Sequence, residues 1–323
     1  MSKLGNVIEG AMESLAKGNE GREQPGRSDA PGKARDPFNE VLRDSQAPGK
    51  TLRQISVDGE PAWEAGIIAR LADARQRITT RSVELDFKRL DSLGILNPEN
   101  PSQRVAEELR IIKRRLLINT ISLQEQGLKN GNVIMVTSSM PGEGKSFLAI
   151  NLAISIAMEI DRTAFLIDAD PTKASVSHVL GIGAGFGLSD LLSNPNLDLA
   201  DTLLKTNIEK LKILPSGKRL RDMTEYLASR KTELVMEELA RKYHDRIIII
   251  DSPPLLATTE AAVLQRMAGQ IIVVVEAERT KRSDLQTALS LLDEQKKIGL
   301  VLNKTTERQE TNYYEAHQRL QKD

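Results

Sequence analysis

Apolar residues in the second half of the chain fall into short continuous runs, and most runs are followed by a stretch with helical spacing. Ile247 to Ile250 is the purest run, and residues 133–136 form another just before a glycine-rich segment. Such runs are typical of strands buried on both faces, as in a parallel sheet covered by helices. The pattern predicts strands at 132–138, 163–167, 211–214, 246–250, 270–275 and 298–302, with helices at 144–160, 258–267 and 281–295 and two more before 243. The expected fold class is α/β, with a mostly parallel β-sheet and helices on both faces.

The first 130 residues lack this alternation. Residues 17–50 contain five glycines and four prolines among charged residues, a composition that predicts a disordered linker. Before it, Leu4, Ile8, Met12 and Leu15 have near-helical spacing, which fits either a short amphipathic docking helix or a frayed terminus.

Charged helical patterns follow the linker. Residues 64–90 predict helix, and Ser102 can cap a second helix that runs from about residue 104 to 119. The predicted organisation has four parts: a mostly disordered region 1–63, a helical N-terminal extension 64–130 that includes an oligomerisation helix 104–117, a nucleotide-binding domain 131–305 and a mobile tail 306–323.

Composition limits the expected cellular location and partners of the chain, but it does not indicate which reaction the chain catalyses. The 323 residues include 45 Lys and Arg against 45 Asp and Glu, so no net charge directs the chain to nucleic acid. The absence of cysteine excludes a disulfide or a thiolate site and suits the cytoplasm. No apolar run approaches the roughly 20 residues that a membrane-spanning helix needs. We therefore expect a cytoplasmic protein that reaches a membrane only through a partner.

Residues 139–146 read Ser-Met-Pro-Gly-Glu-Gly-Lys-Ser and directly follow the first strand predicted in the domain. The spacing of the two glycines, Lys145 and Ser146 fits a phosphate-binding loop, although Ser139 stands where the pattern usually begins with glycine. Glycines let the backbone wrap around phosphate oxygens, and Lys145 would neutralise the β- and γ-phosphates. Ser146 would offer its hydroxyl to Mg²⁺, and the helix that follows adds the positive end of its dipole. The motif predicts a P-loop NTPase.

Two further predicted strands end in acidic residues. Asp168 and Asp170 follow the apolar run 165–167, and Asp251 follows Ile250. Because the carboxyl ends of parallel strands meet at one edge of a sheet, these carboxylates should lie beside the P-loop. One or two of them, with a hydroxyl and phosphate oxygens, suffice for Mg²⁺, and another could accept a proton from an attacking hydroxyl. The alternative is that Asp168 and Asp170 only cap the next element.

Together, these motifs resemble those of the bacterial tyrosine kinases, the P-loop autokinases of capsule and exopolysaccharide assembly. The resemblance covers roughly residues 84–323, and residues 90–114 look most like the branch associated with exosortase (XrtA) and PEP-CTERM loci. Pro171-Thr172-Lys173 departs from the family pattern, which usually has an arginine soon after Asp-x-Asp. The matching segments are 138–146, the triplet 165–167 with its Asp-x-Asp, and the run 247–250 with its Asp-Ser-Pro-Pro.

The resemblance implies an ATP-dependent protein-tyrosine kinase that uses Mg²⁺. Asp168 is then the expected general base, and Lys145, Asp170 and Asp251 complete the catalytic set. The ligands implied for Mg²⁺ are Ser146, Asp168, Asp170 and Asp251. The nucleotide contacts implied are Ser139, Met140, Pro141, Gly142, Glu143, Gly144, Lys145, Ser146, Phe147 and Asn303.

The resemblance also implies self-assembly and phosphorylation in trans. The family oligomerises through a Glu-x-x-Arg-x-x-Arg helix, which Glu107, Arg110 and Lys113 match with lysine for the last arginine. A ring-like homo-oligomer, as large as an octamer, would present Tyr313 and Tyr314 of one copy to the next. The partners implied are a transmembrane polysaccharide co-polymerase (chain-length determinant) that activates the kinase at the inner face of the plasma membrane, and a tyrosine phosphatase. The outcome would be control of exopolysaccharide chain length and export.

Two other functions fit part of the motif set. A MinD- or ParA-like regulatory ATPase shares the expected fold, but its P-loop has a further lysine at the position of Met140. A non-catalytic nucleotide-binding scaffold for a polysaccharide export complex needs no acceptor tyrosine. Phosphotyrosine made from ATP separates the kinase from both alternatives.

Overall fold

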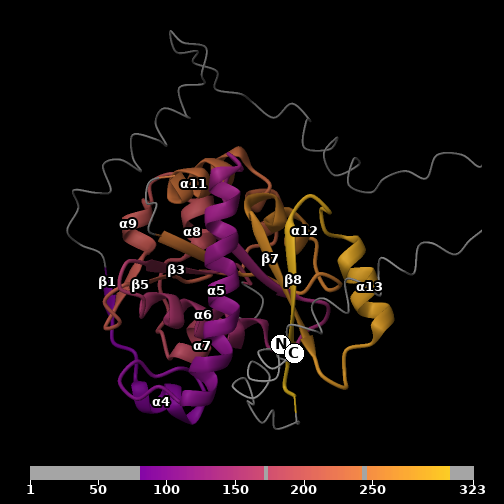
Figure 1. Ribbon diagram of the computed structural model, residues 1–323. Coiled ribbons are helices and arrows are strands. Elements are labelled where there is room, and N and C mark those ends of the chain that lie inside the picture. Colours follow the sequence, from indigo (N-terminus) through magenta and orange to yellow (C-terminus); the bar gives the residue numbers. More distant parts are fainter. Residues whose placement is uncertain (1–80, 171–173, 242–245, 306–323) are drawn as a thin grey trace, which may run out of the picture. The chain divides into compact units, whose positions relative to one another are not determined.

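A computed structural model describes residues 81–170, 174–241 and 246–305. The expectations for residues 1–63, for Pro171-Thr172-Lys173 and for the tail 306–323 with Tyr313 and Tyr314 fall outside these ranges. Contacts divide the chain into the units 1–66 and 67–323, and the second unit contains every described residue. This unit is built around a single eight-stranded sheet with the order β1-β4-β5-β3-β6-β2-β7-β8 (Figure 1).

All neighbouring strands of the sheet run parallel except β4 and β5, which are antiparallel. The strands are β1 Arg81–Val83, β2 Val133–Ser138, β3 Thr163–Asp168, β4 Leu204–Thr206, β5 Leu211–Leu214, β6 Arg246–Asp251, β7 Gln270–Glu276 and β8 Lys297–Asn303. The described helices are α4 Phe87–Ser92, α5 Gln103–Glu125, α6 Lys145–Ala157, α7 Ser175–Leu180, α8 Leu188–Ser193, α9 Leu199–Thr202, α10 Met223–Leu227, α11 Arg230–Arg241, α12 Glu260–Leu264, the 3₁₀ turn η1 Gln265–Met267 and α13 Arg282–Ser290.

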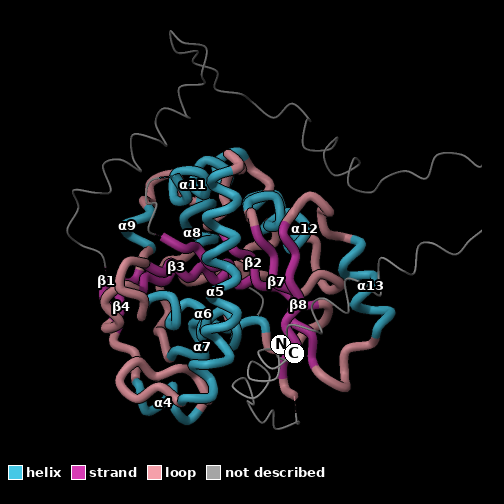
Figure 2. The backbone as a smooth tube through the Cα atoms, viewed as in Figure 1, coloured by secondary structure: helices cyan, strands magenta, loops and turns pink. Residues whose placement is uncertain are grey.

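Different helices cover the two faces of the sheet (Figure 2). Helices α4 to α7 share one apolar core with the sheet, and helices α8 to α13 share the other. Successive residues of a strand point to opposite faces. In β6, Ile247 and Ile249 therefore join the first core, while Ile248 and Ile250 join the second. The unbroken apolar run of this strand reflects burial on both sides.

Helix α5 is anchored to the sheet by a buried amide. The Nε2 group of Gln270, the first residue of β7, lies 3.1 Å from the Leu116 carbonyl, 3.0 Å from the Thr120 hydroxyl and 2.8 Å from the Gly131 carbonyl. Leu109 and Leu116 of α5 belong to the same apolar core as α6. The helix therefore packs on the domain, with α6 between it and β3.

The expected α/β fold class is confirmed, with strand ends within about one residue of those predicted. The helix expected over 64–90 is confirmed at residues 87–90, which begin α4, and is wrong at residues 81–86. Residues 81–83 form β1, because their extended backbone pairs with β4 at Leu204–Thr206. Helix α5 extends to Glu125, six residues beyond the predicted end. Among the described residues, no helix is long and apolar enough to cross a membrane.

Candidate active site

The phosphate loop connects the end of β2 to the start of α6. Gly142 and Gly144 have φ angles of 94° and 102°, in the left-handed region that strains any residue with a side chain. A Cβ atom on Gly144 would lie 2.0 Å from Asn303 Nδ2, so the site also lacks room for one. Helix α6 begins at Lys145, and the N–H groups of a first turn have no acceptor within their helix. The loop has the backbone geometry of an anion cradle.

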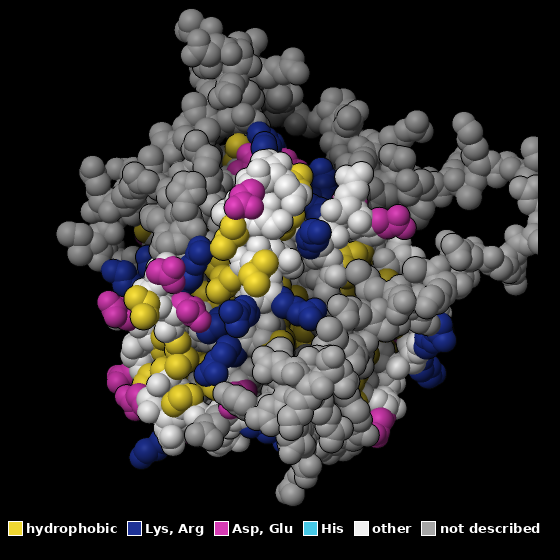
Figure 3. Space-filling view, viewed as in Figure 1, with side chains coloured by type: hydrophobic (Ala, Val, Ile, Leu, Met, Phe, Trp, Pro, Cys, Tyr) yellow, Lys and Arg dark blue, Asp and Glu magenta, His cyan; other side chains and the backbone are white. Residues whose placement is uncertain are grey.

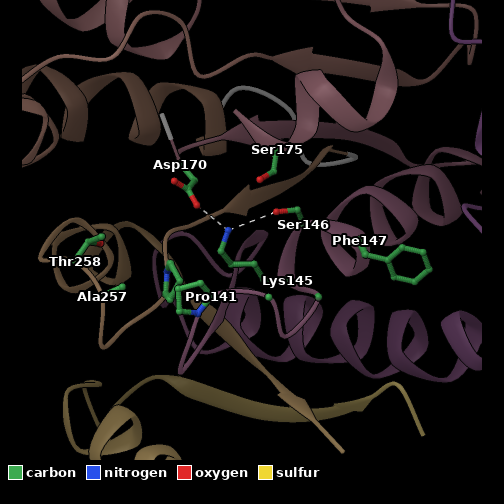
Figure 4. Close-up of a pocket in the computed structure, with 11 residues that line it drawn as sticks. Pro141, Lys145, Ser146, Phe147, Asp170, Ser175, Ala257 and Thr258 are labelled. Atoms are coloured by element: carbon green, nitrogen blue, oxygen red, sulfur yellow. Dashed lines mark hydrogen bonds and ion pairs between the residues drawn. The ribbon is translucent and has the colours of Figure 1, made fainter. Parts of the chain in front are cut away.

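Lys145 projects from the first position of α6 toward Asp170 (Figure 4), and Asp251 and Asp168 also lie near its amine. Its Nζ lies 2.8 Å from Asp170 Oδ2, 3.9 Å from Asp251 Oδ1 and 3.5 Å from the Ser146 hydroxyl. Burial lowers the pKa of Lys145, but attraction to Asp251 and Asp170 outweighs burial and raises it. The lysine therefore stays charged, and it partly neutralises an otherwise acidic site.

The other two carboxylates near Lys145 are Asp168 and Asp251, which are the last residues of β3 and β6. Asp168 ends β3 and is fully buried, and it accepts hydrogen bonds from the N–H groups of Asp170 at 3.1 Å and Val176 at 3.3 Å. Burial, followed by repulsion from Asp251, raises the pKa of Asp168 to about 8. Burial also raises the pKa of Asp251 to about 6, against the opposing attraction of Lys145. Neither oxygen of Asp251 accepts a well-formed hydrogen bond.

A cavity of about 230 Å³ opens above the loop. Of the three carboxylates, only Asp170 lines it, and Asp168 and Asp251 lie beneath its wall. Ser175, from the start of α7, and Thr258 come from opposite sides of the same space (Figure 4). Motif spacing did not single out either hydroxyl, because each precedes or follows a motif by several residues. The full lining is Pro141, Gly142, Gly144, Lys145, Ser146, Phe147, Asp170, Ser175, Pro254, Ala257 and Thr258.

Three of the residues expected to bind nucleotide have other contacts here, and the side chain of a fourth, Phe147, points away from Lys145. The Met140 N–H donates to Glu143 Oε2 at 2.8 Å, and Asn303 Nδ2 donates to the Glu143 carbonyl at 2.9 Å. The Phe147 ring lies at the cavity rim and points away from Lys145 (Figure 4). Nucleotide contacts by these residues stay a prediction.

The residues expected to mediate oligomerisation do not share one environment. Glu107 and Arg110 are exposed on α5. The Lys113 amine is held within the chain, where it donates to the Ser155 carbonyl at 3.0 Å and pairs with the Glu159 carboxylate. Both partners lie at the C-terminal end of α6. A contact of Lys113 with a second copy stays a prediction.

The outer face of α5 combines apolar and basic side chains (Figure 3). Ile111, Ile118 and Ile121 are 41%, 58% and 45% exposed, and Arg114 and Arg115 are exposed beside them. Isolated exposed isoleucines are common on protein surfaces, so this face identifies no partner.

The donor set of the site suits Mg²⁺. Asp251 has two buried oxygens without hydrogen bonds, Asp170 lines the cavity and Ser146 contributes a hydroxyl. Within the described ranges, no group of three or more His, Cys, Asp or Glu side chains could hold a metal ion by itself. Mg²⁺ needs only one or two carboxylates, because phosphate oxygens and water complete its shell. The residues therefore fit this ion in the presence of a nucleotide.

A glycine-rich loop at the carboxyl edge of a parallel sheet, with a lysine and strand-end carboxylates around it, defines a P-loop nucleotide-binding protein. A family model described as an AAA domain matches residues 131–306, which is more than half of the chain. The tyrosine-protein kinase CpsD of Streptococcus pneumoniae serotype 4 is 38% identical over 217 residues, which cover 63% of this chain and 91% of that protein. The chain belongs to this AAA-domain family and, within it, to the bacterial tyrosine kinases.

Two further similarities agree with this assignment. The putative tyrosine-protein kinase CapB of Staphylococcus aureus is 28% identical over 218 residues, which cover 67% of this chain and 91% of that protein. The crystal structure of the chimerical protein CapA2B2 has a TM-score of 0.56 and 26% identity, covering 76% of this chain and all of that one. The expected family, enzyme class and nucleotide-binding character are confirmed. The placement near the exosortase-associated branch stays a prediction.

Proposed function

We propose that this chain is an ATP-dependent protein-tyrosine autokinase that phosphorylates Tyr313 and Tyr314 of a neighbouring copy. The observation that carries the proposal is the convergence of Lys145, Asp170 and Asp251 on one phosphate loop. Membership of the bacterial tyrosine kinases supports the transfer of phosphate to tyrosine rather than to water. The Met140 side chain, in place of a further lysine, also argues against a MinD- or ParA-like ATPase.

Lys145 has two successive partners in this proposal. Without nucleotide, its ammonium group pairs with Asp170. The β- and γ-phosphates of ATP carry more negative charge than one carboxylate, so they draw the lysine toward the loop. Its departure leaves Asp170 and Asp251 with uncompensated charge beside the Ser146 hydroxyl. These three groups would then hold Mg²⁺, with Asp168 beneath them.

Mg²⁺, when bound, neutralises charge on the phosphate groups of ATP. The protein positions the other reacting groups. The backbone N–H groups of the loop orient the phosphates, and the first turn of α6 adds its dipole. Because phosphoryl transfer requires little covalent chemistry from the protein, positioning and electrostatics provide most of the acceleration.

Asp168 is the proposed general base for the phenol of the incoming tyrosine. A pKa of about 8 in the nucleotide-free site lies near the operating pH, as efficient proton transfer requires. Asp168 is fully buried and does not line the cavity, so access of a phenol depends on a rearrangement of the site, for which the release of Asp170 from Lys145 is the proposed cause. Asp170 is the alternative base, because its carboxylate already lines the cavity.

Transfer in trans requires an assembly of copies. Glu107, Arg110 and Lys113 match the helix through which bacterial tyrosine kinases oligomerise, and they support a ring-like homo-oligomer. The membrane activator in the proposal is a transmembrane polysaccharide co-polymerase, and a tyrosine phosphatase reverses the reaction. The proposed biological role is regulation of exopolysaccharide chain length and export.

Incubation of the purified chain with ATP and Mg²⁺, followed by mass spectrometry, tests the activity. Phosphate should appear on Tyr313 or Tyr314 and be absent from the Lys145→Met variant. ATP turnover without phosphotyrosine would move the assignment to a regulatory ATPase. Nucleotide binding without turnover would favour the scaffold.

A complementary pair of variants tests the direction of transfer. Lys145→Met keeps the acceptor tyrosines without the phosphate-binding lysine, and the double variant Tyr313→Phe/Tyr314→Phe keeps the site without the acceptors. Neither should label alone. In a mixture of the two variants, phosphate on the Lys145→Met chain shows transfer in trans. No label in this mixture, under conditions where the wild-type chain labels itself, contradicts transfer in trans.

A further inference from the structure

The phosphate loop is held from its outer side by the residues at the end of β8. The Gly142 carbonyl accepts a hydrogen bond of 2.8 Å from Lys304 Nζ, and the Glu143 carbonyl accepts one of 2.9 Å from Asn303 Nδ2. Asn303 is the last residue of β8, and Lys304 follows it. Two consecutive peptide groups of the loop are therefore fixed by two consecutive side chains more than 150 positions downstream.

Lys304 is itself held in place. Its Nζ lies 3.0 Å from Glu276 Oε1 at the end of β7, and this hydrogen bond lowers the pKa of Glu276. The backbone of Lys304 has a φ of 58°, which is uncommon for a residue with a side chain. A left-handed conformation at this position costs free energy, so surrounding contacts must favour it. The contacts that Lys304 makes with the loop and with Glu276 are of this kind.

Two more hydrogen bonds close a ring of contacts around the loop, and a third attaches the ring to Met140. The Glu276 N–H donates to the Thr280 hydroxyl at 2.9 Å, and that hydroxyl donates to Glu143 Oε1. The other oxygen of Glu143 accepts from the Met140 N–H at 2.8 Å. Glu143 is 3% exposed, so its carboxylate does not extend into solvent and instead holds the loop through these two hydrogen bonds. The ring consists of Gly142, Lys304, Glu276, Thr280 and Glu143.

The geometry of the peptide bond links this ring to the cavity. In a planar trans peptide, the carbonyl oxygen and the N–H of the next residue point in opposite directions. Lys304 holds the Gly142 carbonyl outward, so the Glu143 N–H faces the opposite side. Asn303 holds the Glu143 carbonyl outward and so directs the Gly144 N–H in the same way. Gly142 and Gly144 line the cavity, which makes this the side that receives phosphate.

We infer that Lys304 is a positioning residue for the phosphates of the nucleotide, acting through the Gly142 peptide without contacting the ligand. Glu276 orients Lys304, and Thr280 with Glu143 holds the rest of the loop. The inference rests on nucleotide binding at the P-loop and does not require tyrosine phosphorylation. A kinase assay that failed would leave the binding measurements below unaffected.

The decisive experiment measures the Kd of ADP and of inorganic tripolyphosphate for the full-length chain. Lys304→Met should weaken both by about tenfold, equivalent to about 1.4 kcal/mol. The Lys304 side chain is 46% exposed, so its loss opens no core and the melting temperature without ligand should stay unchanged. Lys304→Arg should recover most of the affinity, because guanidinium can donate to the same carbonyl and carboxylate.

Lys297→Met is the matched control. Lys297 is exposed at the first position of β8, and Lys304 directly follows the last, so this variant removes an equal charge near the same strand without altering the ring. Its Kd should equal that of the wild type within about twofold, because distant surface charges are screened. Equal losses in the two variants would reduce the role of Lys304 to net charge and overturn the inference.

Two further results show whether Lys304 acts by positioning the loop peptide or by contacting the nucleotide directly. Glu276→Gln should weaken tripolyphosphate binding less than Lys304→Met does, and the double variant should bind like Lys304→Met alone, because both act on one path. Additive losses would contradict a shared path. A loss for ADP without one for tripolyphosphate would place Lys304 against the base or sugar and overturn the inference.

Discussion

Two lysines lie on opposite sides of the phosphate loop, and their surroundings differ. The Lys145 side chain is 7% exposed and is surrounded by Asp170, Asp251 and Asp168. The Lys304 side chain is 46% exposed and pairs with a single carboxylate, that of Glu276. Both are cations within 3.0 Å of an acidic oxygen. They differ in how much water the surrounding protein excludes.

This difference in burial indicates that Lys145 acts mainly through its charge, whereas Lys304 acts mainly through the orientation that it gives to the Gly142 carbonyl. A buried cation among carboxylates supports the folded state by neutralisation, since each unpaired buried charge is costly. An exposed ion pair contributes little to stability, because water already solvates both groups. Lys304 matters through the carbonyl that it orients. Substitution of the two lysines should therefore produce different losses.

The largest expected effect follows Lys145→Met. Removal of the buried cation should lower the free energy of unfolding by about 3–5 kcal/mol without nucleotide and should reduce nucleotide binding below detection. Lys304→Met should change the unfolding free energy by less than about 1 kcal/mol. Urea denaturation at pH 7 measures both. Similar values for the two variants would contradict the comparison.

The second effect concerns the carboxylates that Lys145 neutralises. Asp168→Asn should reduce kcat for tyrosine phosphorylation by about 10²–10⁴-fold while leaving the Kd of ADP nearly unchanged. Asp170→Asn should reduce kcat and weaken Mg·ADP binding together, since Asp170 lines the cavity. Single-turnover phosphorylation with titrations of ADP separates the two. Normal turnover by Asp168→Asn would contradict Asp168 as the general base and would favour Asp170 for that role.

The third effect is a dependence of stability on pH. The pKa of Asp168 is raised to about 8 in the folded chain, from an ordinary value of about 4 when unfolded. Between these values the folded state binds more protons, so the stability that Asp168 contributes is present at low pH and is lost as pH rises through about 8. Asp251 adds a similar loss up to about pH 6.

Thermal unfolding of the nucleotide-free chain between pH 5 and 9 measures this dependence. Asp168→Asn cannot ionise, so it should be more stable than the wild type at pH 8 by several kcal/mol, because each unit by which the pKa of Asp168 is raised corresponds to about 1.4 kcal/mol. At pH 5 the two chains should differ little. Parallel pH profiles for the two chains would contradict a buried, protonated Asp168.

The smallest effect distinguishes the lysines by salt. Raising KCl from about 0.05 to about 0.5 M shortens the screening length severalfold. The pair between Lys304 and Glu276 is exposed to this change, so the ratio of Kd values for Lys304→Met and wild type should shrink about twofold. The pair between Lys145 and Asp170 is buried and is little affected by salt, so the stability difference caused by Lys145→Met should persist. Tripolyphosphate titrations and urea curves at both salt concentrations provide the comparison.

Much of this architecture could be predicted from local pattern. Apolar runs such as Ile247 to Ile250 identified the central strands, and the residues that follow them identified the loop and its carboxylates. The three-residue strands β1 and β4 could not be found, because so short a segment carries no periodicity and depends on its neighbours for pairing. The parallel pairing of β1 with β4 and the antiparallel pairing of β4 with β5 are tertiary properties.

The less predictable part of the site consists of contacts between distant segments. Nothing near Lys304 indicates that its amine reaches Gly142, 162 positions earlier. Lys113 was expected at an interface between copies because of its motif spacing, yet its amine is held by α6. Such contacts depend on how elements pack, and the spacing of residues in a single sequence contains no record of that packing.

Helix α6 connects the phosphate loop, at its N-terminal end, with a contact from α5 at its C-terminal end. Its first residue is Lys145. Lys113 of α5 contacts its other end, through the Ser155 carbonyl in the last turn and the Glu159 carboxylate two residues after the helix ends. The 13 residues span about 20 Å. A rod of this length that is packed along its sides bends little, so it transmits displacement. We therefore expect a displacement of α5 to shift α6 as one rigid element, and Lys145 with it.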